Sequence, residues 1–161
     1  MPQISMANIT KTPGTTIDFT PGNEYINPAN GKMYKYVKAA EAIAVYQHVV
    51  ISTDGNATIL EADTDDTALN GAFCSPAGCA QIAFASGTYG WLFIGGGDYI
   101  GNFATTVALH ALYASATSGV LDDAAVGGKE CMLMGCFTLS TGGAAGTAYA
   151  AGRMYFQGIV A

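Results

Sequence analysis

The four cysteines are the residues whose type and spacing come closest to a chemical motif. They form two pairs, Cys74 with Cys79 and Cys131 with Cys136, and the members of each pair are separated by four residues. Four thiolates could hold zinc, since structural zinc sites place paired ligands about two to four residues apart. Residues five positions apart on one strand, however, face opposite ways. We therefore favour buried free thiols, and we expect no metal and no other cofactor.

Other groups that could catalyse a reaction lack the necessary pattern. An acidic run at residues 61–66 could bind calcium, but it lacks the glycine and final glutamate of a helix–loop–helix calcium site. His48 and His110 are the only histidines, and neither lies in a metal or nucleophile motif. Neither a nucleophile elbow nor a phosphate-binding loop is present. We expect packed or exposed histidines, a solvated acidic loop and no enzyme.

The stretch from Gly87 to Phe103 is the strongest structural signal in the chain. Its rings Tyr89, Trp91 and Phe93 stand at alternate positions, so in a strand they share one face. The opposite face is also apolar, and a strand of this kind needs cover on both sides. The glycine run 95–97 predicts a turn, and we interpret the whole stretch as a hairpin.

Short apolar segments recur between turn signals at the spacing of a β-sandwich or barrel. We predict an all-β fold, a small antiparallel barrel or sandwich. A short helical turn is also possible at 64–71, and residues 76–78 are interpreted as a turn. The other expected strands are 34–38, 39–51, 57–62, 72–74, 80–85, 107–116, 120–121, 130–139 and 153–160.

The first 31 residues differ from the rest of the chain because they hold four of the five prolines. They contain few large apolar residues, so we predict an extended N-terminal arm at 1–31 and a β domain at 32–161. The arm could dock on a neighbouring subunit, or it could lie along its own domain. The candidate partner-interface residues are Ile17, Phe19, Tyr25, Ile26, Tyr155 and Phe156.

Charged residues make up only 11% of the chain, against about 25% in an ordinary soluble domain. A chain with so few charged residues often buries much of its surface in contacts with copies of itself or with a partner, so we expect an oligomer. The net charge of −6 and the lack of a basic patch argue against nucleic-acid and membrane-surface binding. No apolar run is long enough for a spanning helix, and residues 1–8 lack the pattern of a secretion signal. We expect synthesis in a cytoplasm, where thiols stay reduced, which disfavours a disulfide between Cys74 and Cys79.

Several short motifs resemble those of the head decoration, or capsid cement, proteins of tailed bacteriophages. They are Tyr36–Ala40, Gly87–Trp91, Leu112–Ser115 and Gly119–Asp123, and the similarity spans roughly Tyr34–Val126. The resemblance implies a β-rich barrel or sandwich that forms a homotrimer. The resemblance further implies that the protein binds the major capsid protein on the exterior of the virion and stabilises the shell. It implies no catalytic residues.

Two other functions remain open at this point. One is another virion component, such as a head-fibre base or a tail-tube protein. The other is a carbohydrate-binding β-sandwich in which Tyr89, Trp91 and Phe93 stack on sugar rings. That use requires the three rings to be exposed beside polar groups.

Overall fold

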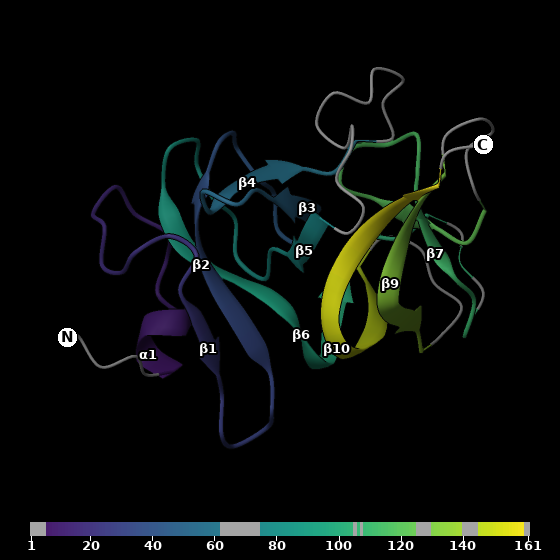
Figure 1. Ribbon diagram of the computed structural model, residues 1–161, viewed down its shortest axis with the longest axis horizontal. Helices are drawn as coiled ribbons and strands as arrows, with labels where there is room; N and C mark the ends of the chain where they lie inside the picture. Colours follow the sequence, from purple (N-terminus) through teal and green to yellow (C-terminus); the bar gives the residue numbers. More distant parts are fainter. Residues whose placement is uncertain are drawn as a thin grey trace.

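The computed structural model describes residues 6–61, 75–104, 106, 108–124, 130–139 and 145–159, and the fold is all-β as predicted (Figure 1). In these residues ten strands form one mixed sheet, and the helix α1 is a single turn. The elements are α1 (Met6–Ile9), β1 (Glu24–Ile26), β2 (Met33–Ala39), β3 (His48–Ile51), β4 (Asn56–Ile59), β5 (Ser75–Cys79), β6 (Tyr89–Gly101), β7 (Leu112–Ala114), β8 (Leu121–Asp122), β9 (Glu130–Thr138) and β10 (Gly146–Ile159).

Five strands close into a partial ring in the order β2, β4, β3, β5 and β6. The ring is completed because β2 also pairs with β6 along most of its length, whereas β5 and β6 share one register pair. The β2–β4 pair is parallel and the others are antiparallel. One apolar core lies among these strands: Val37, Ala39, Ile43, Val49, Ile51, Ala57, Ala80, Phe84, Leu92 and Ile94.

The predicted hairpin at 87–103 is wrong, because β6 runs without a break from Tyr89 to Gly101. Its first half pairs with β2 and its second half with β10, and the glycines lie where the partner changes. A Cβ on Gly95 would lie 1.8 Å from the Gly152 carbonyl oxygen, and one on Gly96 would lie 2.2 Å from that of Gly31. Both glycines also have positive φ angles, 143° and 80°. The run therefore permits close backbone approach within a strand rather than forming a turn.

Both faces of β6 are covered, as its apolar pattern predicts. Leu92 faces the ring core, and Trp91 on the other face is only 6% exposed. Trp91 packs in a separate cluster with Ile9, Phe19 and Tyr36, where the Phe19 and Trp91 rings are 5.4 Å apart. The cover on this face comes from the chain's own N-terminal segment.

The described part of the predicted arm lies on its own domain, and an extended arm is not confirmed. Gly14 and Tyr89 exchange two backbone hydrogen bonds, of 3.1 and 2.8 Å, which fix the segment to the start of β6. Further along, β1 pairs with β2. Figure 1 shows α1 and β1 beside β2 at one end of the long axis, with β7 and β9 at the other.

Several strand boundaries differ from those expected. The residues predicted to turn at 76–78 belong to β5, where Gly78 fits closely against the Phe93 carbonyl oxygen. Residues 80–85 form only an isolated bridge between Phe84 and Ile43, so the strand predicted there is wrong. Of the strand predicted at 107–116, the described residues form only β7, Leu112–Ala114. The last strand, β10, begins at Gly146, seven residues before the predicted start at 153. The predicted features at 64–71 and 72–74 lie outside the described residues.

Candidate interaction surface

One face of the sheet formed by β6, β10 and β9 is apolar and exposed. Register pairs place Ile100, Thr147 and the residue after β9, Leu139, in one row across the three strands. The next row joins Asp98, Tyr149 and Phe137. The intervening residues Tyr99, Ala148, Ala150, Cys136 and Thr138 are buried on the opposite side. We call Ile100, Phe137, Leu139 and Tyr149 the outer face.

Leu109, near the end of β9, is a further exposed apolar residue. Its backbone φ is 66°, in the left-handed region that a leucine rarely adopts, yet its side chain is 72% exposed. Its N–H donates to the Thr138 carbonyl oxygen at 3.0 Å, which holds it beside the end of β9.

Aromatic contact strengthens the centre of the outer face. The Phe137 and Tyr149 rings lie 5.7 Å apart on neighbouring strands, and Tyr149 is exposed. Asp98 lies at one edge, where its carbonyl oxygen accepts a hydrogen bond from the Lys32 ammonium at 2.6 Å. The face therefore offers rings and aliphatic side chains with charge at its margin, which is the usual anatomy of a protein interface.

The sequence-predicted interface residues are distributed over several environments. Ile17 and Ile26 are 59% and 58% exposed, and Ile26 lies on the edge strand β1. Phe19 is buried against Trp91, and Tyr25 is half-buried beside the same ring at 6.4 Å. Tyr155 lines a small cavity, and the side chain of Phe156 lies outside those described. The structure therefore does not bring the six into one patch.

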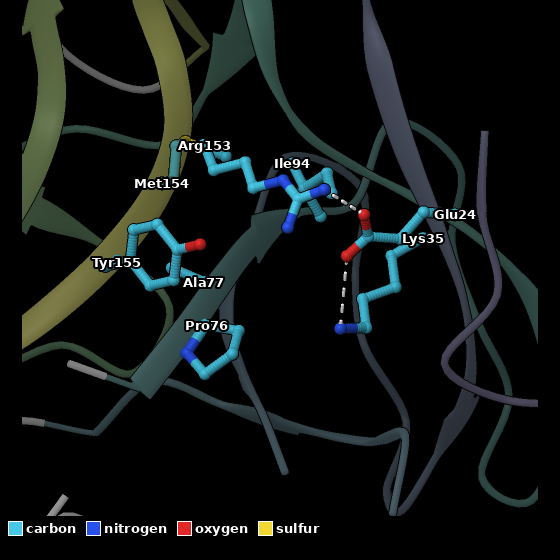
Figure 2. A pocket seen from close by; sticks show the side chains of 8 residues that line it. All are labelled: Glu24, Lys35, Pro76, Ala77, Ile94, Arg153, Met154 and Tyr155. Atoms are coloured by element: carbon cyan, nitrogen blue, oxygen red, sulfur yellow. Dashed lines mark hydrogen bonds and ion pairs between the residues drawn. The ribbon is translucent and has the colours of Figure 1, made fainter. Parts of the chain in front are cut away.

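The cavity beside Tyr155 holds a cluster of charges (Figure 2). Glu24 on β1 pairs with Lys35 on β2 at 3.5 Å and also with Arg153 on β10. The cavity has a volume of about 60 Å³, and the ion pairs are partly open to water. Such pairs are screened and stabilise the fold weakly. Their clearest effect is to tie the first strand to the last.

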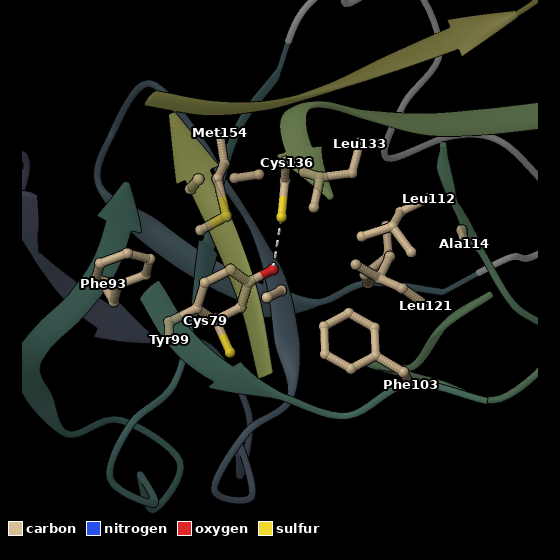
Figure 3. Packing of buried hydrophobic residues seen from close by; sticks show 14 residues of the cluster. Cys79, Phe93, Tyr99, Phe103, Leu112, Ala114, Leu121, Leu133, Cys136 and Met154 are labelled. Atoms are coloured by element: carbon tan, nitrogen blue, oxygen red, sulfur yellow. Dashed lines mark hydrogen bonds between the residues drawn. The ribbon is translucent and has the colours of Figure 1, made fainter. Parts of the chain in front are cut away.

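A second apolar core, which includes Phe93, Tyr99, Leu133 and Cys136, contains a short series of buried polar groups, and Figure 3 shows its Tyr99–Cys136 contact. His48 Nδ1 lies 3.2 Å from the Gly119 carbonyl oxygen, His48 Nε2 lies 3.1 Å from the Tyr99 hydroxyl, and that hydroxyl lies 3.1 Å from Cys136 Sγ. Burial lowers the pKa of His48 to about 4 and raises the pKa of Cys136 to about 11. All three groups are therefore neutral near pH 7.

The described cysteines are free and buried, as favoured from the sequence: Cys79 and Cys136. Burial raises the pKa of the Cys79 thiol well above its usual value, so its thiolate is scarce. Cys74 and the side chain of Cys131 lie outside the described residues. Within the part of the chain that the structure describes, no three His, Cys, Asp or Glu residues gather as a metal site.

Sequence reasoning missed the outer face. A signal was present: residues 147–150 alternate Thr, Ala, Tyr and Ala, which predicts a strand with one small buried side and one larger exposed side. The exposure of Leu109 could not be predicted from such an alternation, because residues 107–116 have the pattern of one continuous strand. Among the described residues no helix has the length and apolar character to span a bilayer.

Comparison with known proteins finds no matching family model, no similar curated protein and no similar solved structure.

Proposed function

We propose that this chain is a virion structural protein that binds the outside of a tailed-phage capsid and stabilises the shell. The observation that carries the proposal is the outer face, a cluster of exposed apolar side chains in a chain with only 11% charged residues. Exposed apolar patches on a folded domain mark interaction sites. The resemblance of the motifs at 36–40, 87–91, 112–115 and 119–123 to capsid cement proteins supplies the biological setting.

The proposal assigns the outer face to the major capsid protein. Rings such as Tyr149 supply contact area at a small cost in conformational entropy. It assigns contacts between sister copies in a homotrimer to the β1 edge, where Ile26 is exposed and one side of the strand pairs with no other described strand. An unpaired strand edge readily accepts a strand from a neighbour.

The test of shell binding is cosedimentation with expanded capsids that lack this protein, from the phage that encodes it. The wild-type chain should bind expanded capsids and not immature ones. Leu139→Lys and Tyr149→Lys should lower the bound fraction at least about tenfold, because each places an ammonium in an apolar contact. Thr58→Lys on β4 is the matched control, since Thr58 is exposed and far from the outer face in strand order.

The outcomes separate the alternatives. Equal binding by the two outer-face variants and Thr58→Lys, or no binding by any form, would refute shell attachment through this face. Binding to purified tails but not to heads would favour a tail component. Sedimentation velocity of Ile26→Lys tests the sister contact separately: we expect loss of the trimer with an unchanged melting temperature.

A further inference from the structure

The small cavity beside Tyr155 has more positive than negative charge in its wall (Figure 2). Lys35 and Arg153 both line it, and Glu24 is the one carboxylate among the described residues of the lining. Both cations pair with that same carboxylate, Lys35 with Oε1 at 3.5 Å and Arg153 with Oε2. One negative charge therefore faces two positive charges, and one positive charge is left unbalanced.

This excess is unusual in so acidic a chain. The sequence has 6 lysines and arginines against 12 aspartates and glutamates, and two of those six basic residues meet at this cavity. The other described lysines are engaged elsewhere: Lys11 with a carboxylate, Lys32 with a backbone carbonyl oxygen and Lys38 with an aromatic ring. Within the described part of the chain, basic side chains thus gather here.

Hydrogen-bond donors from two strands surround the same space. The Arg153 guanidinium has more N–H donors than Glu24 can use, and one terminal nitrogen serves that carboxylate. Figure 2 shows the other terminal nitrogen directed away from Glu24 into the cavity, with the Tyr155 hydroxyl and the Lys35 ammonium around it. Arg153 and Tyr155 share one face of β10, because the residue between them, Met154, is buried on the other.

The size of the cavity limits what can enter it. Its volume is about 60 Å³, roughly the share of two water molecules in the liquid, whereas sites for whole drug-sized molecules span about 300–1,000 Å³. Its charged wall is open to solvent, since the Lys35 side chain is 17% exposed and that of Arg153 is 47% exposed. A group of the size of a carboxylate fits this space.

We propose that this cavity binds one carboxylate group, from an acidic side chain of a second copy of this chain or from a free small carboxylate. A carboxylate balances the excess charge, and its two oxygens accept hydrogen bonds from the guanidinium and hydroxyl donors. A cation would meet two like charges, and an apolar group would leave the donors without partners.

The chain has a single arginine, so the Nε–Hε signal of Arg153 in a nitrogen–proton NMR spectrum reports on this cavity alone. The experiment titrates the isolated protein with sodium formate at constant, low ionic strength. We expect a saturable shift of this signal with half-saturation in the millimolar range. Formamide, the neutral counterpart of formate, should give no saturable shift.

Two lysine variants on β2 test the role of the excess charge. Lys35→Met removes the ammonium but keeps an unbranched stem, and it should weaken formate binding by about fivefold or more. Lys38→Met makes the same change on the same strand, where the ammonium lies over the Tyr89 ring outside the cavity, and should leave the affinity unaltered. Circular dichroism of both variants confirms the fold.

The proposal is overturned if formate gives no saturable shift, if formamide gives an equal one, or if chloride binds more tightly than formate. It is equally overturned if Lys38→Met weakens binding as much as Lys35→Met. Because no capsid is present, none of these results bears on shell binding.

A second measurement identifies the source of the carboxylate. Sedimentation velocity compares the protein in saturating sodium formate with the protein in sodium chloride of equal ionic strength. Dissociation of copies in formate alone would show that an acidic side chain of a second copy fills the cavity. Unchanged sedimentation, together with a saturable formate shift, would show that the cavity takes a free small carboxylate.

Discussion

At the scale of single residues, the hydrogen-bond geometry fixes which atoms of His48, Tyr99 and Cys136 carry a proton. A carbonyl oxygen only accepts hydrogen bonds, so His48 Nδ1 must carry the proton that is shared with Gly119. His48 Nε2 is then an acceptor for the Tyr99 hydroxyl, and the Tyr99 oxygen is free to accept from the Cys136 thiol. Protonation of His48 would turn Nε2 into a donor, so the Tyr99 hydroxyl would lose its acceptor in a fully buried site.

We predict that stability falls as pH drops from about 6.5 toward 4. The pKa of His48 is about 4 in the folded state, below the ordinary value of 6.5 in an unfolded chain. Between these values the unfolded chain binds the extra proton, so acid favours unfolding, and the stability is fully present only above the unfolded pKa. Urea denaturation should show a loss of about 2 kcal/mol between pH 7.5 and pH 5.

The controls exchange each histidine for glutamine. His48→Gln should remove most of this pH dependence, although it lowers stability at every pH. His110→Gln should keep the dependence, because His110 is exposed beside Asp123. If His48→Gln retains the same slope between pH 7.5 and pH 5, the titrating group is elsewhere.

At the scale of elements, β6 explains both what the sequence could predict and what it could not. The alternation of Tyr89 to Ile94 predicts the strand and its two covered faces, because burial follows local pattern. The glycine run could not be interpreted correctly, because its partners Gly31 and Gly152 are distant in sequence. The same limit applies to Phe19, whose burial depends on Trp91 on a strand more than seventy residues later. The outer face was missed because β10 was predicted to begin too late.

We predict that Gly95→Ala destabilises the protein by at least about 3 kcal/mol. The new Cβ would overlap the Gly152 backbone, and the φ of 143° suits glycine alone. Gly152→Ala is the matched control, since a Cβ there meets no atom within 4 Å. Chemical denaturation of both variants checks the expectation. A Gly95→Ala protein as stable as Gly152→Ala would mean that β6 can shift away from β10.

At the scale of the whole molecule, few charges and several exposed apolar side chains combine in one chain. Ile26 lies at the β1 end of the sheet order and the outer face near the β9 end, so exposed apolar side chains occur at two separate places in the sheet. The net charge of −6 gives copies of the chain a mutual electrostatic repulsion in solution. The same charge would make a mainly electrostatic attachment strongly dependent on salt.

We predict that shell attachment survives high salt. The outer face is apolar, and burial of apolar surface is not screened by ions, whereas exposed ion pairs are. The bound fraction in cosedimentation should be unchanged, or higher, when sodium chloride rises from about 0.1 M to about 1 M. Release at the higher concentration would show that charged residues outside the outer face hold the protein on the shell.

The uninterrupted course of β6 has a mechanical consequence. The backbone of β6 runs as one strand from its pairing with β2, which begins at Tyr89, to its pairing with β10, which ends at Gly101. If the chain binds a capsid as proposed, tension from the packaged genome would pass along this strand into the hydrogen-bond ladders on both sides and would load the two ladders together.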